Sequence, residues 1–160
     1  TARGGGRGIS RRESERFQRC YEPVLAQTAI GNIGLSICYD IRFPELYQGL
    51  SEAGADLLVI PSAFTAVTGA AHWHILQRAR AIETGCFVLS AAQYGTHADG
   101  RQTYGHALIV APWGEVLADA GSSDKGFVTA DIDLAACGAA QKRHGTADNR
   151  QKLMPVRIIS

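Results

Sequence analysis

The sequence predicts an α/β domain built on a mixed β-sheet. Residues 33–38 alternate apolar and small side chains with a period of two, which is typical of a strand. Apolar residues at helical spacing follow from Phe43, and the continuous apolar run at 56–60 indicates a strand that is buried on both faces. Strands that alternate with helices, followed by a hairpin, give this class of fold.

The first half of the chain is expected to form a hairpin and then a strand–helix–strand unit. Val24 to Ala26 and the strand at 33–38 pair through a turn at 30–32. A helix from about Phe43 to Ala53 ends at Gly54, the residue type that commonly stops helices. The strand at 56–60 follows, and its connection is expected to be right-handed.

The second half is expected to add one long helix, four strands and a short helix. The long helix covers 71–84, a polar loop covers 94–105, and the short helix covers 134–141. Pro112 and Gly114 take the second and fourth positions of a turn. The four strands are expected at 87–93, 106–110, 116–118 and 127–133.

Composition excludes several classes of protein. The chain is 46% apolar and 19% charged, and its net charge of +1 gives no overall attraction to nucleic acid or to an anionic membrane. Its four cysteines form no C-x-x-C pair, so neither a zinc site nor a disulfide scaffold is indicated, and a cytoplasmic location is expected. No apolar run approaches the roughly 18 residues of a membrane helix, and no signal peptide is recognisable.

Residues 1–22 form an Arg/Gly-rich segment that is expected to be a loop within the domain. Six arginines fall in 1–19, opposed only by Glu13 and Glu15. A nucleic-acid-binding arm is the alternative. A solvated loop is favoured because Phe17 is the only aromatic residue among the arginines and no P-loop lysine follows the glycines.

Cys38 is the leading candidate for a nucleophile. It stands where the strand at 33–38 ends and a helix is about to start, so unpaired N–H groups and the positive end of a helix would favour its thiolate. This layout is that of a nucleophile elbow with sulfur in place of a hydroxyl. The alternative is a small buried apolar residue, the commoner role of a cysteine at the end of a strand.

The residues after the cysteine change this balance. The segment Cys38-Tyr39-Asp40-Ile41-Arg42-Phe43-Pro44-Glu45-Leu46 resembles the nucleophile segment of the nitrilase superfamily of carbon–nitrogen hydrolases. The resemblance is greatest to its small-amide branch, which includes omega-amidase and deaminated glutathione amidase. Further similar stretches follow in the same order at 61–65, 68–69, 71–73, 78–84, 91–93, 104–106 and 112–114.

The resemblance implies a fold and a domain assignment. Members have a four-layer αββα sandwich, so residues 1–160 are expected to be the C-terminal portion of a carbon–nitrogen hydrolase domain, with the N-terminal part absent. The family's general-base glutamate and its lysine would then precede Thr1, because the chain's lysines all lie downstream of Cys38. The chain alone is therefore expected to hydrolyse little amide.

The resemblance also implies roles for residues at the site. Cys38 would attack a small amide through a thioester, the Tyr39 backbone N–H would hold the oxyanion, and Glu13 would be a second carboxylate lining the pocket, with an exposed loop charge as the equal alternative. Substrate-binding residues would be Arg42, Ser62, Ala63, Phe64, Thr68 and His72. Two of these have alternative roles, because Phe64 suits the core equally and Arg42 could brace the turn with Asp40. Glu45 is expected to satisfy buried donors.

Other readings of the sequence are weaker. His72 and His74 lie two apart in a helical pattern and point to different sides, so no metal site and no cofactor are expected. A Cys–His protease using Cys38 with His106 or His144 lacks the expected motif around the cysteine. The rival function is a non-catalytic interaction domain. The expected partners are a small amide and further copies of the chain in a homo-oligomer.

Overall fold

The computed structural model describes residues 22–123, 125–145 and 149. Glu13 and nearly all of the Arg/Gly-rich segment 1–22 lie outside these residues. The elements are β1 (Val24–Thr28), β2 (Gly31–Leu35), the 3-10 helix η2 (Cys38–Arg42), α1 (Pro44–Glu52), β3 (Leu57–Val59), α2 (Ala66–Thr84), β4 (Phe87–Ser90), β5 (Tyr94–Thr96), β6 (Gln102–Tyr104), β7 (Leu108–Val110), β8 (Val116–Asp119) and α3 (Ala135–His144).

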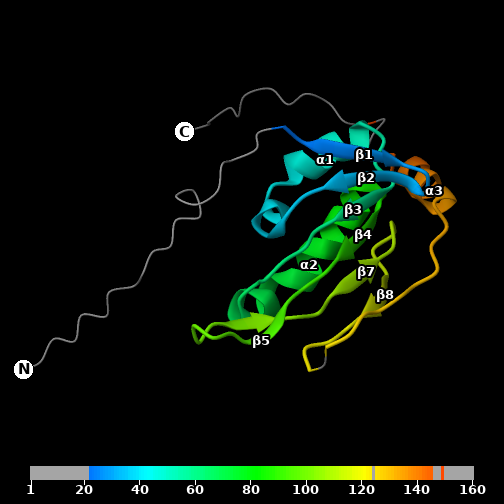
Figure 1. Ribbon diagram of the computed structural model, residues 1–160. Helices are drawn as coiled ribbons and strands as arrows, with labels where there is room; N and C mark the ends of the chain where they lie inside the picture. The colour runs from blue at the N-terminus through cyan, green and yellow to red at the C-terminus, as the bar shows by residue number, and fades with distance from the viewer. Residues whose placement is uncertain (1–21, 124, 146–148, 150–160) are drawn as a thin grey trace, which may run out of the picture.

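The expected mixed sheet is present. Six strands lie in the order β1-β2-β3-β4-β7-β8, and β2, β3 and β4 run parallel, while the other neighbours are antiparallel. The β1–β2 hairpin is confirmed, but Thr28 pairs with Gly31, so its turn lies at 29–30 and begins one residue earlier than expected. Figure 1 shows η2 and β5 toward the end of the sheet where the parallel strands finish, with α3 at the opposite end.

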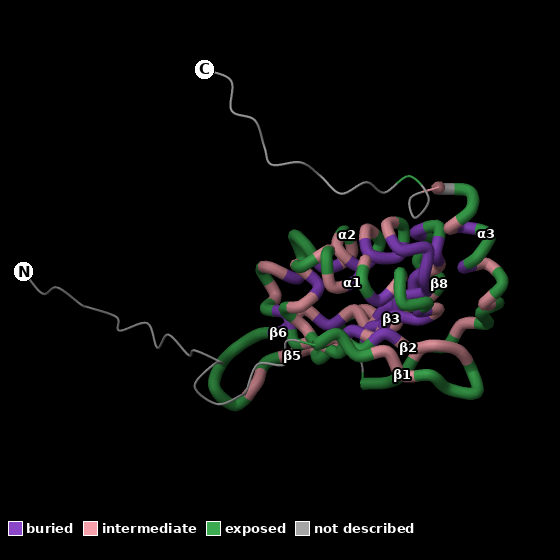
Figure 2. Tube along the Cα trace, turned by 90° about the horizontal axis from the view of Figure 1, so that it is seen from above, coloured by how far each residue is buried: buried purple, intermediate pink, exposed green. Residues whose placement is uncertain are grey.

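The main core lies between the sheet and the two helices α1 and α2. Gly34 on β2 faces α1, because a Cβ built there would lie 2.9 Å from Leu58 and 3.0 Å from Leu50. Leu58 is fully buried and aligned with Val88 on β4, which is equally buried. Figure 2 shows the buried residues between the two helices and the strands. The parallel strands are therefore held in place by helices on one face.

The other face of the sheet is apolar as well. The strand register aligns Val24, Leu35, Val59, Leu89 and Ile109 in one row across five strands. At one end, a second cluster of Leu57, Phe87 and Cys137 covers this face with α3. Along the row, Val24 is 46% exposed and Leu35 is 42% exposed. We call these five residues the apolar row.

Three further expectations about secondary structure need correction. The long helix begins at Ala66 rather than at 71, because the Thr65 side chain caps it by accepting the Thr68 N–H at 3.3 Å. The predicted polar loop 94–105 contains the β5–β6 hairpin. The predicted strand at 127–133 does not form, and Phe127 is 88% exposed, so alternation alone did not supply a neighbouring strand to pair with.

Arg80 is buried, although arginine side chains mostly lie at the surface of proteins. Its Nε donates to the Ile41 carbonyl in η2 at 2.9 Å, and one guanidinium nitrogen lies 2.6 Å from Glu83. The guanidinium also lies 5.5 Å from the centre of the Tyr47 ring. Burial raises the pKa of that tyrosine to about 12. By contrast, Glu45 is exposed, so its predicted role with buried donors is wrong.

Two glycines on helices give opposite predictions for stability. A Cβ at Gly69 would lie 2.2 Å from the Tyr104 Cβ, whereas a Cβ at Gly49 would meet nothing within 4 Å. Gly69→Ala should therefore lower the free energy of unfolding by about 1–3 kcal/mol through overpacking. Gly49→Ala should raise it by roughly 0.5–1 kcal/mol, because alanine loses less backbone entropy. Urea unfolding checks both values, and a neutral Gly69→Ala would contradict the packing of α2 on β6.

Candidate active site

Cys38 is the first residue of η2, and its backbone is strained. Its φ of +46° lies in the left-handed region, which non-glycine residues rarely adopt. The Cys38 N–H donates to the Pro61 carbonyl at 2.9 Å, and this bond connects the start of η2 with the segment that follows β3. The Asp40 carboxylate accepts the Ile37 N–H at 2.8 Å, which confirms the predicted bracing by Asp40. The cysteine is half-buried and packs against the main core.

Tyr39 follows the cysteine in the first turn of η2. Backbone N–H groups in the first turn of a helix have no partner within that helix. The Tyr39 N–H, to which the resemblance assigns the oxyanion, is one of these groups. The Tyr39 side chain is 60% exposed and lies edge-on to Phe43, with 5.7 Å between the ring centres.

Four of the predicted residues meet around the Arg42 guanidinium. Its nitrogens lie 3.4 and 3.5 Å from Nδ1 of His72. Its central carbon lies 5.6 Å from the centre of the Tyr39 ring and 5.3 Å from that of Phe64. We call Tyr39, Arg42, Phe64 and His72 the arginine cluster. It offers a half-buried cation with aromatic walls, which is suited to an anionic group.

The other predicted binding residues do not join this cluster. The Ser62 hydroxyl donates to the Ile60 carbonyl at 3.1 Å, and Thr68 bonds with Thr65 in the helix cap at 2.8 Å. Ala63 is exposed. Within the described ranges, no hydrogen bond, ion pair or ring contact connects any of these three with Arg42. Phe64 is only 8% exposed, so it serves both the core and the cluster.

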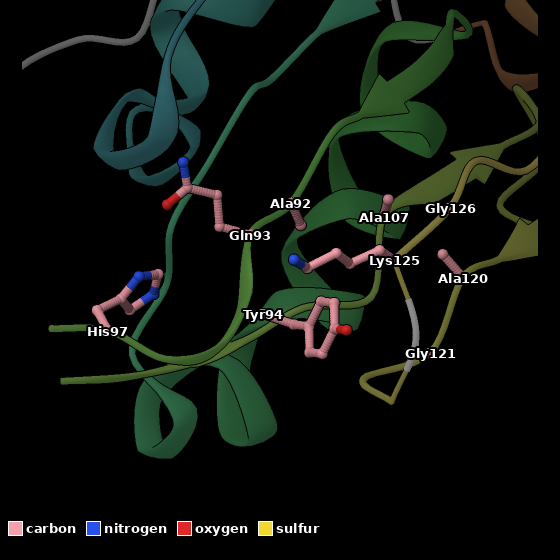
Figure 3. A pocket seen from close by; sticks show the side chains of 9 residues that line it. All are labelled: Ala92, Gln93, Tyr94, His97, Ala107, Ala120, Gly121, Lys125 and Gly126. Carbon is pink, nitrogen blue, oxygen red and sulfur yellow. The ribbon is translucent and has the colours of Figure 1, made fainter. Parts of the chain in front are cut away.

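A cavity of about 480 Å³ lies beside the end of β4. Figure 3 shows the Lys125 side chain extending across it toward the chain that follows β4. None of the predicted binding residues lines it, although Gln93 belongs to one of the stretches of family resemblance. The lining residues are Ala92, Gln93, Tyr94, His97, Ala107, Ala120, Gly121, Lys125 and Gly126.

A second polar cluster lies on the other side of α2. His74 Nε2 and His106 Nδ1 lie 3.0 and 2.9 Å from the Asp119 carboxylate. Partial burial by itself would raise the pKa of Asp119, but hydrogen bonds from His74, the Gly121 N–H and His106 hold it below its usual value. The sequence expectation that His72 and His74 point to different sides is confirmed, because His72 faces Arg42 instead.

The remaining described cysteines lie in the interior. The Cys86 thiol donates to the Ala55 carbonyl at 3.0 Å, and burial raises its pKa. Burial, reinforced by the nearby Cys86, raises the pKa of Cys137 to about 11. Both are fully or nearly fully covered, whereas Cys38 is half-buried. Exposure therefore separates Cys38 from these two.

Alkylation with limiting iodoacetamide should distinguish these thiols. At neutral pH Cys38 should be labelled ahead of Cys86 and Cys137, because a thiol four pH units below its pKa is only about one ten-thousandth thiolate. Labelling of Cys137 should rise steeply only toward pH 11, its own pKa. Peptide mass spectrometry locates the label. Cys38→Ser should remove the early label from the peptide that contains residue 38, and equal rates at all three sites would contradict an accessible Cys38.

Residues 6–142 match the model of the carbon-nitrogen hydrolase family, and the chain belongs to that family. The expected nitrilase-type fold is thereby confirmed. Within the described residues, no helix is both long and apolar enough to cross a membrane.

The chain is also similar to individual proteins and solved structures. It is 55% identical over 113 residues to the deaminated glutathione amidase of a Synechocystis strain, a match that covers 71% of this chain and 41% of that protein. The crystal structure of the C. elegans NitFhit protein is 47% identical, with a TM-score of 0.72, over 78% of this chain and 30% of that one. Saccharomyces cerevisiae Nit3, a member of branch 10 of the nitrilase superfamily, is 32% identical with a TM-score of 0.74, over 82% and 48%. The chain thus spans less than half the length of each.

Proposed function

We propose that this chain supplies the nucleophile of an amidohydrolase that acts on small linear amides. The observation that supports it best is the Cys38 turn, in which a half-buried thiol is held at a left-handed φ of +46°. Backbone strain of this kind costs about 1–3 kcal/mol and is concentrated at functional sites. Membership of the carbon-nitrogen hydrolase family supports a functional role for the strained cysteine.

The proposed reaction has two steps. The Cys38 sulfur attacks the amide carbonyl, the C–N bond breaks, and ammonia leaves with the thiol proton. Water then attacks the thioester, the C–S bond breaks, and a carboxylic acid and the thiol result. The Tyr39 N–H stabilises the oxyanion of each tetrahedral intermediate, a contribution typically worth about 2.7–4 kcal/mol.

The arginine cluster is proposed to hold a carboxylate of the substrate. Arg42 is a half-buried cation four residues after the nucleophile, and its fork of N–H donors suits a carboxylate. Phe64 and Tyr39 would exclude water from one side of that contact. The name of the Synechocystis relative, deaminated glutathione amidase, is compatible with a carboxylate-bearing amide. Ser62, Ala63 and Thr68 remain proposed as more distant walls, and Glu13 as a second carboxylate.

Acylation of the chain tests the proposed nucleophile. The resemblance assigns a catalytic lysine to a position before Cys38, whereas the lysines of this chain, Lys125, Lys142 and Lys152, all follow it. Slow turnover of an unactivated amide is therefore expected. We therefore choose the nitrophenyl ester of a small dicarboxylic acid, whose leaving group needs no protonation. Incubation should release nitrophenolate and leave an acyl group on Cys38, as measured by absorbance and peptide mass spectrometry.

Matched variants decide the outcome of this experiment. Cys38→Ala should abolish the acyl adduct, whereas Cys86→Ala should keep it, because the Cys86 thiol is buried. Circular dichroism checks that each variant is folded. An adduct on another residue, or none on folded wild-type chain, would support the rival function of a non-catalytic interaction domain.

The role of Arg42 predicts a preference among esters. Wild-type chain should be acylated faster by an ester with a distal carboxylate than by the same ester capped as a methyl ester. Arg42→Gln should remove roughly 10- to 100-fold of that preference, since a hydrogen bond to a charged group is worth about 1.5–3 kcal/mol. Arg78→Gln is the control, because Arg78 bonds the Gly114 carbonyl instead. An unchanged preference in Arg42→Gln would contradict the binding of a substrate carboxylate by the arginine cluster.

The assembly and location of the chain are also proposals. We propose a homo-oligomer in the cytoplasm, with no nucleic acid or membrane as partner. The apolar row supports association, since Val24 and Leu35 leave an apolar face of the sheet partly open. The buried thiols Cys86 and Cys137 are compatible with a reducing compartment.

A further inference from the structure

We infer that His74, His106 and Asp119 form a binding site for a divalent transition-metal ion, with Zn²⁺ the best fit. Each residue offers one ligand atom, and these atoms all lie within 4.8 Å of one another. The three residues come from different parts of the fold, namely α2, the segment before β7, and the end of β8. The site is separate from Cys38 and does not depend on the proposed hydrolysis.

The separations already approach those of a zinc site. Zn–ligand bonds of about 2.0–2.1 Å at tetrahedral angles place two ligand atoms roughly 3.3–3.4 Å apart. His74 Nε2 lies 3.0 Å from one Asp119 oxygen, and His106 Nδ1 lies 2.9 and 3.0 Å from the two oxygens. A metal ion would replace the ring protons that now point at the carboxylate and would move each imidazole from it by a few tenths of an ångström. It would also draw together the two imidazole nitrogens, which lie within 4.8 Å of each other.

The backbone holds two of the ligands in place. His106 has a left-handed φ of +57°, its N–H donates to the Gly121 carbonyl at 2.7 Å, and its own carbonyl accepts the Trp73 indole N–H at 2.7 Å. One oxygen of Asp119 accepts the Gly121 N–H at 2.8 Å. These bonds fix the His106 backbone and the carboxylate before any ion binds. Such preorganisation lowers the entropic cost of binding.

A surrounding shell orients the imidazoles. The Tyr104 hydroxyl lies 3.5 Å from His74 Nδ1, which leaves Nε2 of that ring directed at the carboxylate. The Tyr104 ring stacks on His106 with 4.4 Å between ring centres, and His74 meets His106 edge-on at 4.9 Å. Partners at the second nitrogen of a metal-binding histidine commonly set its orientation. The Tyr104 hydroxyl and ring are placed for that role.

The type of ligand selects the class of ion. Two imidazoles and one carboxylate suit Zn²⁺, Co²⁺ or Ni²⁺ and disfavour Ca²⁺ or Mg²⁺, which prefer oxygen ligands. The side chains are 22–33% exposed, so an ion can enter from solvent and keep a water molecule as its fourth ligand. This inference departs from the sequence expectation of no metal, which considered the pair His72 and His74.

Titration of the 160-residue chain with Zn²⁺ tests the site. After treatment with a chelator, calorimetry with Zn²⁺ alone should show one saturable site per chain that depends on these residues. Co²⁺ in its place should give the visible absorption bands of a low-coordinate imidazole complex. Zn²⁺ should also raise the melting temperature, because it binds only the folded arrangement.

Conservative variants decide the result. His74→Gln, His106→Asn and Asp119→Asn should each weaken Zn²⁺ binding by more than about tenfold. Asparagine is chosen at 106 because it tolerates a left-handed backbone. His97→Gln is the matched control, since His97 bonds Thr103 outside the cluster, and it should bind as wild type.

Melting without metal shows whether each variant is folded, and His74→Gln, on the partly exposed surface of α2, keeps the test decisive if another variant unfolds. The inference is overturned if wild-type chain takes up no Zn²⁺. It is overturned equally if folded His74→Gln binds as tightly as wild type.

Discussion

The hydrogen bond from the Cys38 N–H to the Pro61 carbonyl is the constraint on which the site depends. It extends the parallel pairing of β2 and β3 beyond the last paired residues and turns the chain out of the sheet. A single bond of this kind contributes roughly 0.5–1.5 kcal/mol, whereas the strained backbone costs about 1–3 kcal/mol. The bond alone does not offset the strain. The Asp40 carboxylate and the buried Arg80 supply further bonds to Ile37 and Ile41, and the turn is held by their sum.

Helix α2 contributes one histidine to each of two side-chain clusters. His72 and His74 leave the helix in different directions, toward Arg42 and toward Asp119. Trp73 stands between them, fully buried, where it packs on Phe64 with 4.9 Å between ring centres and bonds the His106 carbonyl. One side chain thus contacts both the arginine cluster and the histidine–aspartate cluster. The rigidity of α2 is a common requirement for the two.

Local pattern was sufficient for the sheet core and for the Cys38 turn, but not for long-range contacts. Alternation predicts β2 and a continuous apolar run predicts β3, because each pattern is contained in a few consecutive residues. The start of α2 was missed, although Thr65 is a helix-capping residue type, because the apolar spacing begins only later. No spacing could bring Asp119 to His74, since they are 45 residues apart in the chain and meet only through strand order. Segment 127–133 alternates well and still forms no strand, because strand formation also needs a partner edge.

Strand β3 separates two packed regions residue by residue, with Leu58 in the main cluster and Leu57 in the other. Inserting one residue into β3 would exchange the side chains that face the two clusters. Insertions and deletions in the middle of the sheet are therefore not tolerated. The tip of the β5–β6 hairpin is under no such restriction, because it lies in solvent and a longer loop adds only a small closure entropy. His97 at that tip also lines the cavity. Evolution can therefore reshape this wall of the cavity while the core of the sheet stays unchanged.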